Sequence, residues 1–280
     1  MSTATNLDDV FTKVSYKRKG KIKNKINKNS NIYTFDNCDT TFIDKDKIIR
    51  RIVVAKEEFL ATGVYESFTA LLTEGLTILK KPKISKIVCF GLGHVSELTI
   101  SRYQFVLLLC LKELYKLEVL LYDPVFNEND IFVLKYFGMI VESKNIEGKY
   151  LVTDNKTTLF YLPHCPKQLL NNLLWANWGL SLSCCIIISN SINKVVEDHT
   201  IKELSISGEY IAKISPYALE LGLVNNFKFF EVFNDTSLHF FPINDLSIVP
   251  VDFWEENVEP VYNDGDVEFI TSQFMSKLTI

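Results

Sequence analysis

The chain has 280 residues, with 30 Lys and Arg against 34 Asp and Glu and a formal net charge of −4. Apolar residues make up 47% and charged residues 23%, which excludes collagen-like, mucin-like and globally disordered chains. The richest apolar run, 105–111, is far shorter than the ~20 residues of a membrane span. We therefore expect a globular protein without a membrane partner.

Charge is distributed unevenly along the chain. Residues 1–28 contain eight Lys and Arg and two Asp, so this segment is +6 and the rest of the chain −10. We interpret residues 1–45 as a disordered basic extension, because they are polar and lack a sustained apolar period. A basic arm can also bind nucleic acid or a nuclear import receptor. The acidic body argues against a nucleic-acid-binding fold, since phosphate contacts need positive charge.

The start of the chain and its cysteines bear on the compartment. The first residues are polar and predict no secretory signal, so we expect a cytoplasmic location, with the nucleus as the alternative. The six cysteines are scattered without a Cys-x-x-Cys pair, which argues against a zinc finger. Cys89, Cys110, Cys184 and Cys185 lie in apolar runs and are predicted to be buried thiols.

Helical and strand patterns alternate through the centre of the chain. Apolar residues at helix spacing predict helical structure over 44–79, with a break at Gly63. Short apolar runs then alternate with helices, which is typical of a parallel sheet buried on both faces. The expected strands are 86–90, 118–122, 139–142, 158–162 and 184–188, and the expected helices are 97–115 with Ser96 as N-cap, 127–137, 167–177 and 194–204.

The segment after residue 204 departs from this alternation. Residues 210–214, 227–233 and 238–241 are β-like, and a short helix over 216–221 would end at Gly222. We expect these elements to extend the sheet at one edge. The prediction is an α/β fold with a Rossmann-like, mostly parallel sheet and helices on both faces. The basic arm and the N-terminal helices precede it. Residues 46–270 would form a single domain, with its motif core at 84–191.

Polar residues follow the predicted strands, and this placement indicates a site. Ligands bind beyond the carboxyl ends of the strands in an open α/β sheet, so four separate segments would meet at one edge. We predict a small-molecule site there. Its candidate residues are Gly91, Gly93, Ser96, Arg102, Asp123, His164, Asn190 and Ser191.

The first of these segments has the form strand, Gly-x-Gly, helix. Gly91 and Gly93 would let the backbone approach a phosphate at a helix N-terminus, although the dinucleotide fingerprint has a third Gly where this chain has Ser96. A tight turn without a ligand is the alternative. Asp123 ends the second strand and could hold a ribose hydroxyl, or initiate a turn with Pro124.

His164 and Cys165 follow a strand, directly before Pro166. His164 could act as an acid or base, or could be held structurally by hydrogen bonds; adjacent side chains usually point apart, so the two are no catalytic dyad by sequence alone. Cys165-Pro166 also has the form of a haem-responsive pair, in which a thiolate ligates the iron.

Two helical features allow more than one interpretation. Arg102 could reach an anion near the glycines, or form a surface ion pair with Glu97 or Glu113. The predicted helix 167–177 carries Asn171 and Trp175 on one face, and Trp178, directly after the helix, continues that face. They would form part of the core, or the wall of a pocket or partner surface.

The order of these motifs resembles a known family. It is Gly91-Leu92-Gly93, Ser101-Arg102-Tyr103-Gln104, Tyr122-Asp123-Pro124-Val125-Phe126, Leu159-Phe160-Tyr161-Leu162-Pro163-His164-Cys165, Asn172-Leu173-Leu174, Asn177-Trp178 and Ile186-Ile187-Ile188-Ser189-Asn190-Ser191. Over about 84–191 the chain is similar to the SRR-like family, named for sensitivity to red light reduced. Leu162 stands where Met is usual, and Ser189 where Gly usually precedes Asn-Ser, which could narrow a pocket there.

The resemblance implies a regulatory protein linked to circadian clock input, to regulation of haem biosynthesis and, in fungal relatives, to microtubule-related phenotypes. It implies no established catalytic activity. The alternatives are a nucleotide- or methyl-donor-dependent enzyme with His164 as acid or base, and a haem-responsive module using Cys165. The expected cofactor is therefore a nucleotide-like ligand or haem, and the protein partner is unidentified. An enzyme is less favoured, because no nucleophile elbow, P-loop Lys or metal spacing is visible.

Deleting residues 1–40 is expected to leave the free energy of unfolding nearly unchanged. Their apolar content is too low to offset the entropy lost on ordering. Denaturant melts of the full chain and of a chain that begins near Thr41 should nearly coincide. A loss of several kcal/mol on truncation would show that the segment packs.

Overall fold

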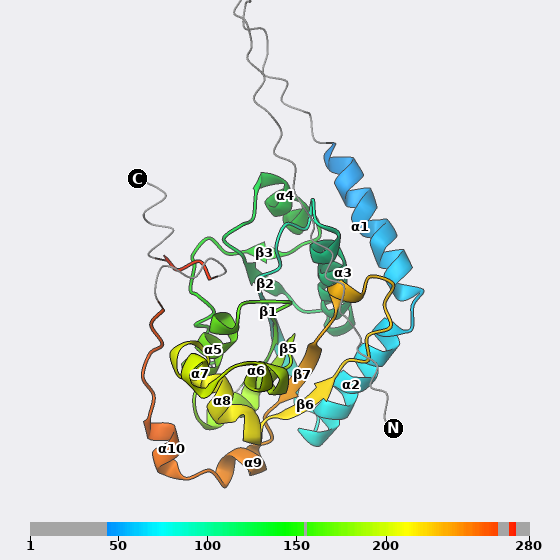
Figure 1. Ribbon diagram of the computed structural model, residues 1–280. Coiled ribbons are helices and arrows are strands. Elements are labelled where there is room, and N and C mark those ends of the chain that lie inside the picture. Colours follow the sequence, from blue (N-terminus) through cyan, green and yellow to red (C-terminus); the bar gives the residue numbers. More distant parts are fainter. Residues whose placement is uncertain (1–43, 154–155, 263–268, 273–280) are drawn as a thin grey trace, which may run out of the picture. The chain divides into compact units, whose positions relative to one another are not determined.

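One seven-stranded sheet organises the residues that the computed structural model describes, which are 44–153, 156–262 and 269–272 (Figure 1). The predicted basic arm therefore lies almost entirely outside the described residues. The strands are β1 (Ile84–Phe90), β2 (Val119–Tyr122), β3 (Ile140–Val141), β4 (Thr157–Tyr161), β5 (Cys185–Asn190), β6 (Leu219–Gly222) and β7 (Thr236–Phe240).

The strand order is β3-β2-β1-β4-β5-β7-β6. Strands β1 to β5 pair in parallel, whereas β7 is antiparallel to both β5 and β6. The predicted parallel sheet and its extension at one edge are thus confirmed. The order reverses between β1 and β4, so the loops after these two strands diverge and leave room at the carboxyl edge of the sheet.

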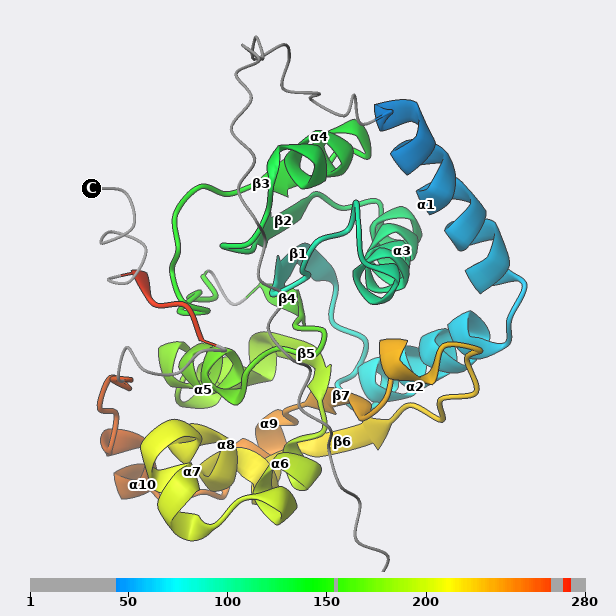
Figure 2. The same ribbon diagram turned by 45° about the horizontal axis from the view of Figure 1, so that its top comes forward.

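Helices cover both faces of the sheet, as predicted (Figure 2). Side chains alternate along β1: Ile87 and Cys89 pack into one apolar cluster, and Val88 and Phe90 into the other. The first face carries α1 (Lys45–Leu60), α2 (Val64–Ile78), α3 (Thr99–Tyr115) and α4 (Glu128–Tyr136), and the second carries α5 (Lys167–Ala176), α6 (Ile192–Asp198), α7 (Ile201–Ser207), α8 (Glu209–Ile214) and α9 (Ile243–Ser247), with α10 (Val251–Glu255) after them.

Several helix boundaries differ from the prediction. The break at Gly63 is confirmed, because this residue is the N-cap of α2. Ser96 is no N-cap: α3 begins at Thr99, and its N-cap, Leu98, forms no side-chain capping bond. The predicted helix 194–204 is two short helices, since Thr200 begins α7 with a new capping box.

Three expectations for the segment after residue 204 were wrong. Residues 210–214 form α8, because Tyr210, Ile211 and Ile214 bury one helical face in the second apolar cluster. The predicted helix 216–221 is a 3-10 turn followed by β6, which pairs with β7. Residues 227–233 form no strand; the Phe227 ring instead contacts Tyr103 of α3, with centroids 5.0 Å apart.

A buried polar cluster joins β6 and β7 to the end of β5. The Glu220 carboxylate accepts hydrogen bonds from Ser191 Oγ at 2.5 Å, Asn193 N at 3.0 Å and Ser237 Oγ at 3.0 Å, and lies 3.5 Å from His239 Nε2. Burial alone would raise the pKa of Glu220. Its hydrogen bond with His239 and the attraction of that residue, together with Ser191 and Asn193, lower the pKa to about 2.

Glu220 is expected to stabilise the fold most at neutral pH. Because its folded pKa of about 2 lies below the ordinary 4.5, its contribution is complete above pH 4.5 and is lost as pH falls toward 2. Glu220→Gln should lower the free energy of unfolding at pH 7 by about 1–3 kcal/mol. The same substitution should also reduce the difference between the free energies of unfolding at pH 7 and pH 3, as measured by urea melts. The exposed Glu231→Gln is the control. An acid dependence that is equal in wild type and Glu220→Gln would contradict this role.

Candidate functional site

A cavity of about 210 Å³ lies at the carboxyl edge of the sheet, where the strand order reverses. The loops after β1, β2 and β4 enclose it. Four candidate residues predicted from the sequence line this cavity, namely Gly91, Gly93, Asp123 and His164, and Cys165 lines it with them. The other walls are mostly apolar and include Phe90, Tyr122, Pro124, Val125, Leu169 and Phe269.

The remaining candidate residues lie elsewhere. Asn190 and Ser191, which end β5 and precede α6, line a second cavity of about 220 Å³. His164 lines both cavities and is the residue where they meet. Ser96 and Arg102 line neither of the two. The structure thus brings four strand ends to one edge, but distributes their side chains over two adjoining cavities.

The packing of Cys165 explains why Gly91 is a glycine. Gly91 has a φ of +69°, a conformation that side chains disfavour, and a Cβ there would lie 2.3 Å from Cys165 Sγ. The thiol in turn donates to the Phe90 carbonyl oxygen at 3.1 Å. This glycine is therefore required by the contact between two loops, whether or not a phosphate is bound.

Asp123 holds the Gly-x-Gly loop from the side of β2. Its Oδ2 accepts from the Gly93 amide at 2.7 Å, and its Oδ1 accepts from the Val125 amide at 3.0 Å. Burial raises the pKa of Asp123, and these two backbone hydrogen bonds oppose the rise. Of the two interpretations of Asp123, the turn-forming one agrees with this geometry.

Asp130, a residue that the sequence interpretation missed, holds the rest of the same loop. This fully buried carboxylate accepts from Ser96 N at 2.9 Å, Ser96 Oγ at 2.6 Å and Asn127 N at 3.1 Å, and lies 2.8 Å from His94 Nδ1. The Asn127-x-x-Asp130 spacing of a capping box was the available signal. Asp123 and Asp130 thus occupy amides that would face a phosphate in a dinucleotide fold.

His164 connects the end of β4 to the segment before β7. Its Nδ1 lies 3.2 Å from the Gln104 amide nitrogen, and its Nε2 lies 3.1 Å from the Asn234 carbonyl oxygen. Because the Gln104 amide donates, Nδ1 accepts and Nε2 carries the proton. Burial lowers the pKa of His164, which favours the neutral ring. Both ring nitrogens are therefore engaged within the protein.

The Cys165 thiol is poorly suited to ligate haem iron. It is buried, and burial, together with the nearby Cys89 and Asp123, raises its pKa well above the ordinary thiol value. A thiolate is the form that binds iron, so this environment works against such ligation. Cys89, Cys110 and Cys185 are also buried, as expected, whereas Cys184 is only half-buried.

Arg102 points its guanidinium to the carbonyl oxygen of Glu97, at 3.2 Å. The Glu97 carboxylate instead accepts from Asn127, and Glu113 pairs with Lys56 at 2.5 Å. Burial lowers the pKa of Arg102. The two ion pairs considered for Arg102 are thus replaced by a contact with the backbone.

The Asn-rich helix α5 fixes the surrounding segments. Asn171 Oδ1 accepts from the Tyr210 amide at 2.8 Å, and Asn171 Nδ2 is 2.9 Å from the Tyr262 hydroxyl. Asn177 Nδ2 donates to the Tyr150 carbonyl oxygen at 2.8 Å. The Trp178 ring packs against Tyr210, with centroids 4.8 Å apart. These contacts favour the structural interpretation of this face.

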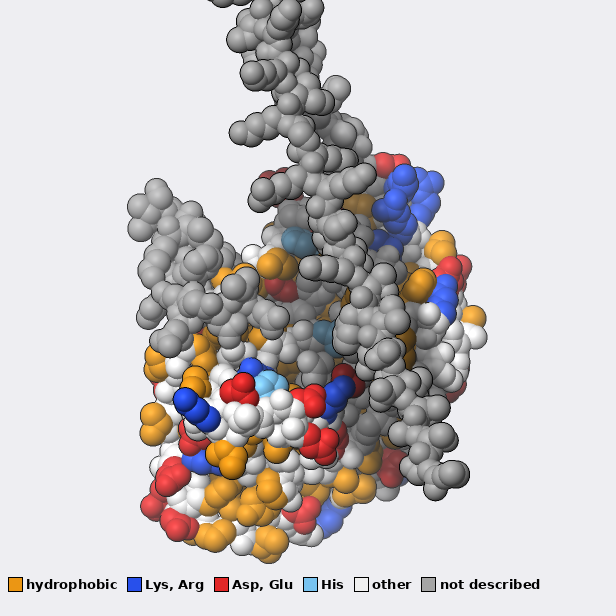
Figure 3. All heavy atoms as spheres, viewed as in Figure 1, with side chains coloured by type: hydrophobic (Ala, Val, Ile, Leu, Met, Phe, Trp, Pro, Cys, Tyr) orange, Lys and Arg blue, Asp and Glu red, His pale blue; other side chains and the backbone are white. Residues whose placement is uncertain are grey.

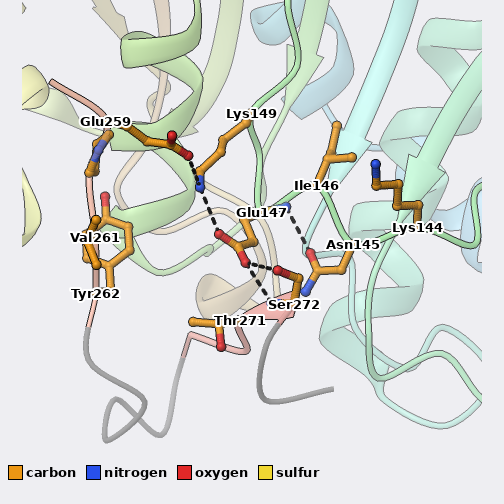
Figure 4. Close-up of a pocket in the computed structure, with 11 residues that line it drawn as sticks. Lys144, Asn145, Ile146, Glu147, Lys149, Glu259, Val261, Tyr262, Thr271 and Ser272 are labelled. Atoms are coloured by element: carbon orange, nitrogen blue, oxygen red, sulfur yellow. Dashed lines mark hydrogen bonds and ion pairs between the residues drawn. The ribbon is translucent and has the colours of Figure 1, made fainter. Parts of the chain in front are cut away.

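A cavity of about 520 Å³, larger than the two that His164 lines, lies between residues 144–149 and the segments 259–262 and 271–272 (Figure 4). Its charged side chains pair with one another: Lys149 Nζ is 3.1 Å from Glu147 and 2.7 Å from Glu259. Ser272 Oγ donates to Glu147 at 2.6 Å. None of the candidate residues predicted from the sequence lines this cavity, which makes it the weaker candidate for a functional centre.

No three His, Cys, Asp or Glu side chains among the described residues lie close enough together to hold a metal ion. Within the same part of the chain, no helix has both the length and the apolar character needed to cross a lipid bilayer.

Comparison with known proteins identifies relatives. The SRR1 domain family matches residues 66–240. An SRR1-like protein of Drosophila melanogaster is 33% identical over 177 residues, which are 62% of this chain and 61% of that protein. An SRR1-like protein of Mus musculus is 38% identical over 134 residues, 46% of this chain and 53% of the mouse protein. Protein SENSITIVITY TO RED LIGHT REDUCED 1 of Arabidopsis thaliana is 26% identical over 210 residues, 66% of this chain and 72% of the plant protein.

These matches confirm the resemblance inferred from the motifs. The family match includes every candidate residue from Gly91 to Ser191. The chain spans about three fifths of the length of the fly relative and about half that of the mouse relative.

Gly91→Ala is expected to lower the free energy of unfolding by roughly 2–4 kcal/mol, from the left-handed backbone and the contact with Cys165. Adding Cys165→Ala should recover part of this loss, because it removes the sulfur but not the backbone strain. Gly63→Ala is the matched control, since nothing lies within 4 Å of its Cβ position. Equal losses for Gly91→Ala and Gly63→Ala in urea melts would refute the proposed packing role.

Proposed function

Because this chain belongs to the SRR1 domain family, we propose that it is a regulatory protein that binds a small molecule at the carboxyl edge of its sheet. The family resemblance gives the processes in which it would act: circadian clock input and the regulation of haem biosynthesis. We place its action in the cytoplasm, with the nucleus as the alternative compartment.

The observation that carries this proposal is the cavity where the strand order reverses, lined by polar groups that are already engaged. Both His164 nitrogens are hydrogen-bonded, and both Asp123 oxygens accept backbone amides. The pKa of the Cys165 thiol is raised by burial, which keeps it protonated. A site with fixed polar groups and apolar walls suits binding better than proton transfer or nucleophilic attack.

The alternative functions receive less support from the same geometry. A nucleotide-dependent enzyme would need amides near Gly93 and Ser96 for phosphate, and these donate to Asp123 and Asp130. A haem module would need an accessible thiolate at Cys165. The cavity beside Cys165 also has a volume of only about 210 Å³, and haem is a large ligand.

A regulator also needs a surface for a partner, and apolar side chains gather over α8 and α9 (Figure 3). Ile248 and Val251, which follow α9, are 78% and 74% exposed. Exposed apolar groups of this kind occur at protein interaction sites. They support a protein partner whose identity is open.

The cavity proposal is tested by filling the cavity. Leu169→Trp places a larger side chain at its wall, whereas Leu114→Trp changes a residue that is 47% exposed on α3 and outside this cavity. Ligand-observed NMR with a library of small metabolites should yield compounds that bind the wild type and Leu114→Trp but not Leu169→Trp. The proposal fails if nothing binds the wild type, or if binding is unaffected by Leu169→Trp.

A further inference from the structure

The sizes of the two cavities suggest a ligand that occupies both. Each has a volume slightly above 200 Å³, below the ~300–1,000 Å³ typical of ligand pockets, and only together do they reach that range. Both are lined by His164, so the two cavities adjoin at this ring. A ligand that occupied both would contact loops that follow β1, β2, β4 and β5.

The first cavity suits a flat apolar group. Tyr122, Leu169 and Phe269 form its walls, and Phe269 is itself only 5% exposed. Asp123 is the sole charged side chain among the described residues that line this cavity.

The second cavity is polar, and the lysine that lines it is already paired with a carboxylate. Asn190, Ser191 and Asn234 offer hydrogen-bonding groups, and Asp198 and Asp235 offer carboxylates. Lys194 is paired with Asp235 at 2.7 Å. Lys194 is also the sole Lys or Arg among the described residues that line either cavity. An anion would meet carboxylates without a free Lys or Arg to balance them, whereas an amine or hydroxyl would find acceptors.

We propose that the two cavities form one site for a planar apolar compound with a short arm that is cationic or neutral, and that nucleotides and other anions are not its ligands. This inference rests on the proposed function and specifies the chemistry of its ligand. The ring would lie in the cavity beside Leu169, and the arm would pass His164 to the acceptors near Asp198.

Three indoles that share a ring and differ in the charge of the arm test this chemistry. They are tryptamine, which is cationic at pH 7, tryptophol, which is neutral, and indole-3-acetate, which is anionic. Calorimetric titration should give an affinity for tryptamine roughly tenfold or more above that for indole-3-acetate, with tryptophol between them. Asp198→Asn should reduce the advantage of tryptamine several-fold and leave tryptophol unchanged. Asp252→Asn, an exposed acid on α10, is the matched control.

Filling each of the two cavities separately tests whether one ligand occupies both cavities. Leu169→Trp and Asn234→Trp should each weaken tryptamine binding about tenfold or more. Equal or tighter binding of indole-3-acetate, or no binding by any of the three, would overturn the ligand class. The proposed function would still stand if library compounds lost binding in Leu169→Trp. Indole binding that is unaffected by both Trp variants would overturn the shared site.

Discussion

Two carboxylates, Asp123 and Asp130, fix the loop on which the carboxyl edge of the sheet depends. Asp123 accepts the Gly93 amide and Asp130 accepts the amides of Ser96 and Asn127, so the loop after β1 is tied to both ends of the β2–α4 connection. Buried carboxylates require such donors, because burying an unpaired charge is costly. The same bonds that stabilise the loop also use the amides that a phosphate would need.

A second set of contacts fixes the other side of the cavity. Cys165 packs against Gly91 and donates to the Phe90 carbonyl oxygen, and His164 is held by Gln104 and the Asn234 carbonyl oxygen. The two most reactive side chains at this edge, those of His164 and Cys165, thus hold loops in place. A ligand would meet the apolar walls of the first cavity and the carboxylates of Asp198 and Asp235 in the second. Such surroundings suit recognition of a neutral or cationic molecule more than catalysis.

The sequence predicted the parts of this arrangement that depend on local pattern. Apolar runs ended by polar turns located β1, β2, β4 and β5, and their common direction placed Gly91, Asp123 and His164 at one edge. It did not predict what those residues contact. Positive φ at Gly91 has the same sequence signature whether the neighbour is a phosphate or the Cys165 sulfur, and Asp130 gains its role only when α4 meets the β1 loop. The β-like pattern of 210–214 misled because short apolar runs fit a strand or a buried helical turn equally well.

At the Gly-x-Gly loop, internal carboxylates bind the amides that a phosphate would otherwise bind. The most direct measurement is the position of the Gly93 and Ser96 amide resonances in ¹H–¹⁵N spectra of the full chain, recorded during titration with inorganic phosphate and with AMP. If Asp123 and Asp130 hold these amides, neither resonance shifts beyond the change seen with matched ionic strength of NaCl. A saturable shift of both resonances with either phosphate compound would contradict the claim and restore the nucleotide interpretation.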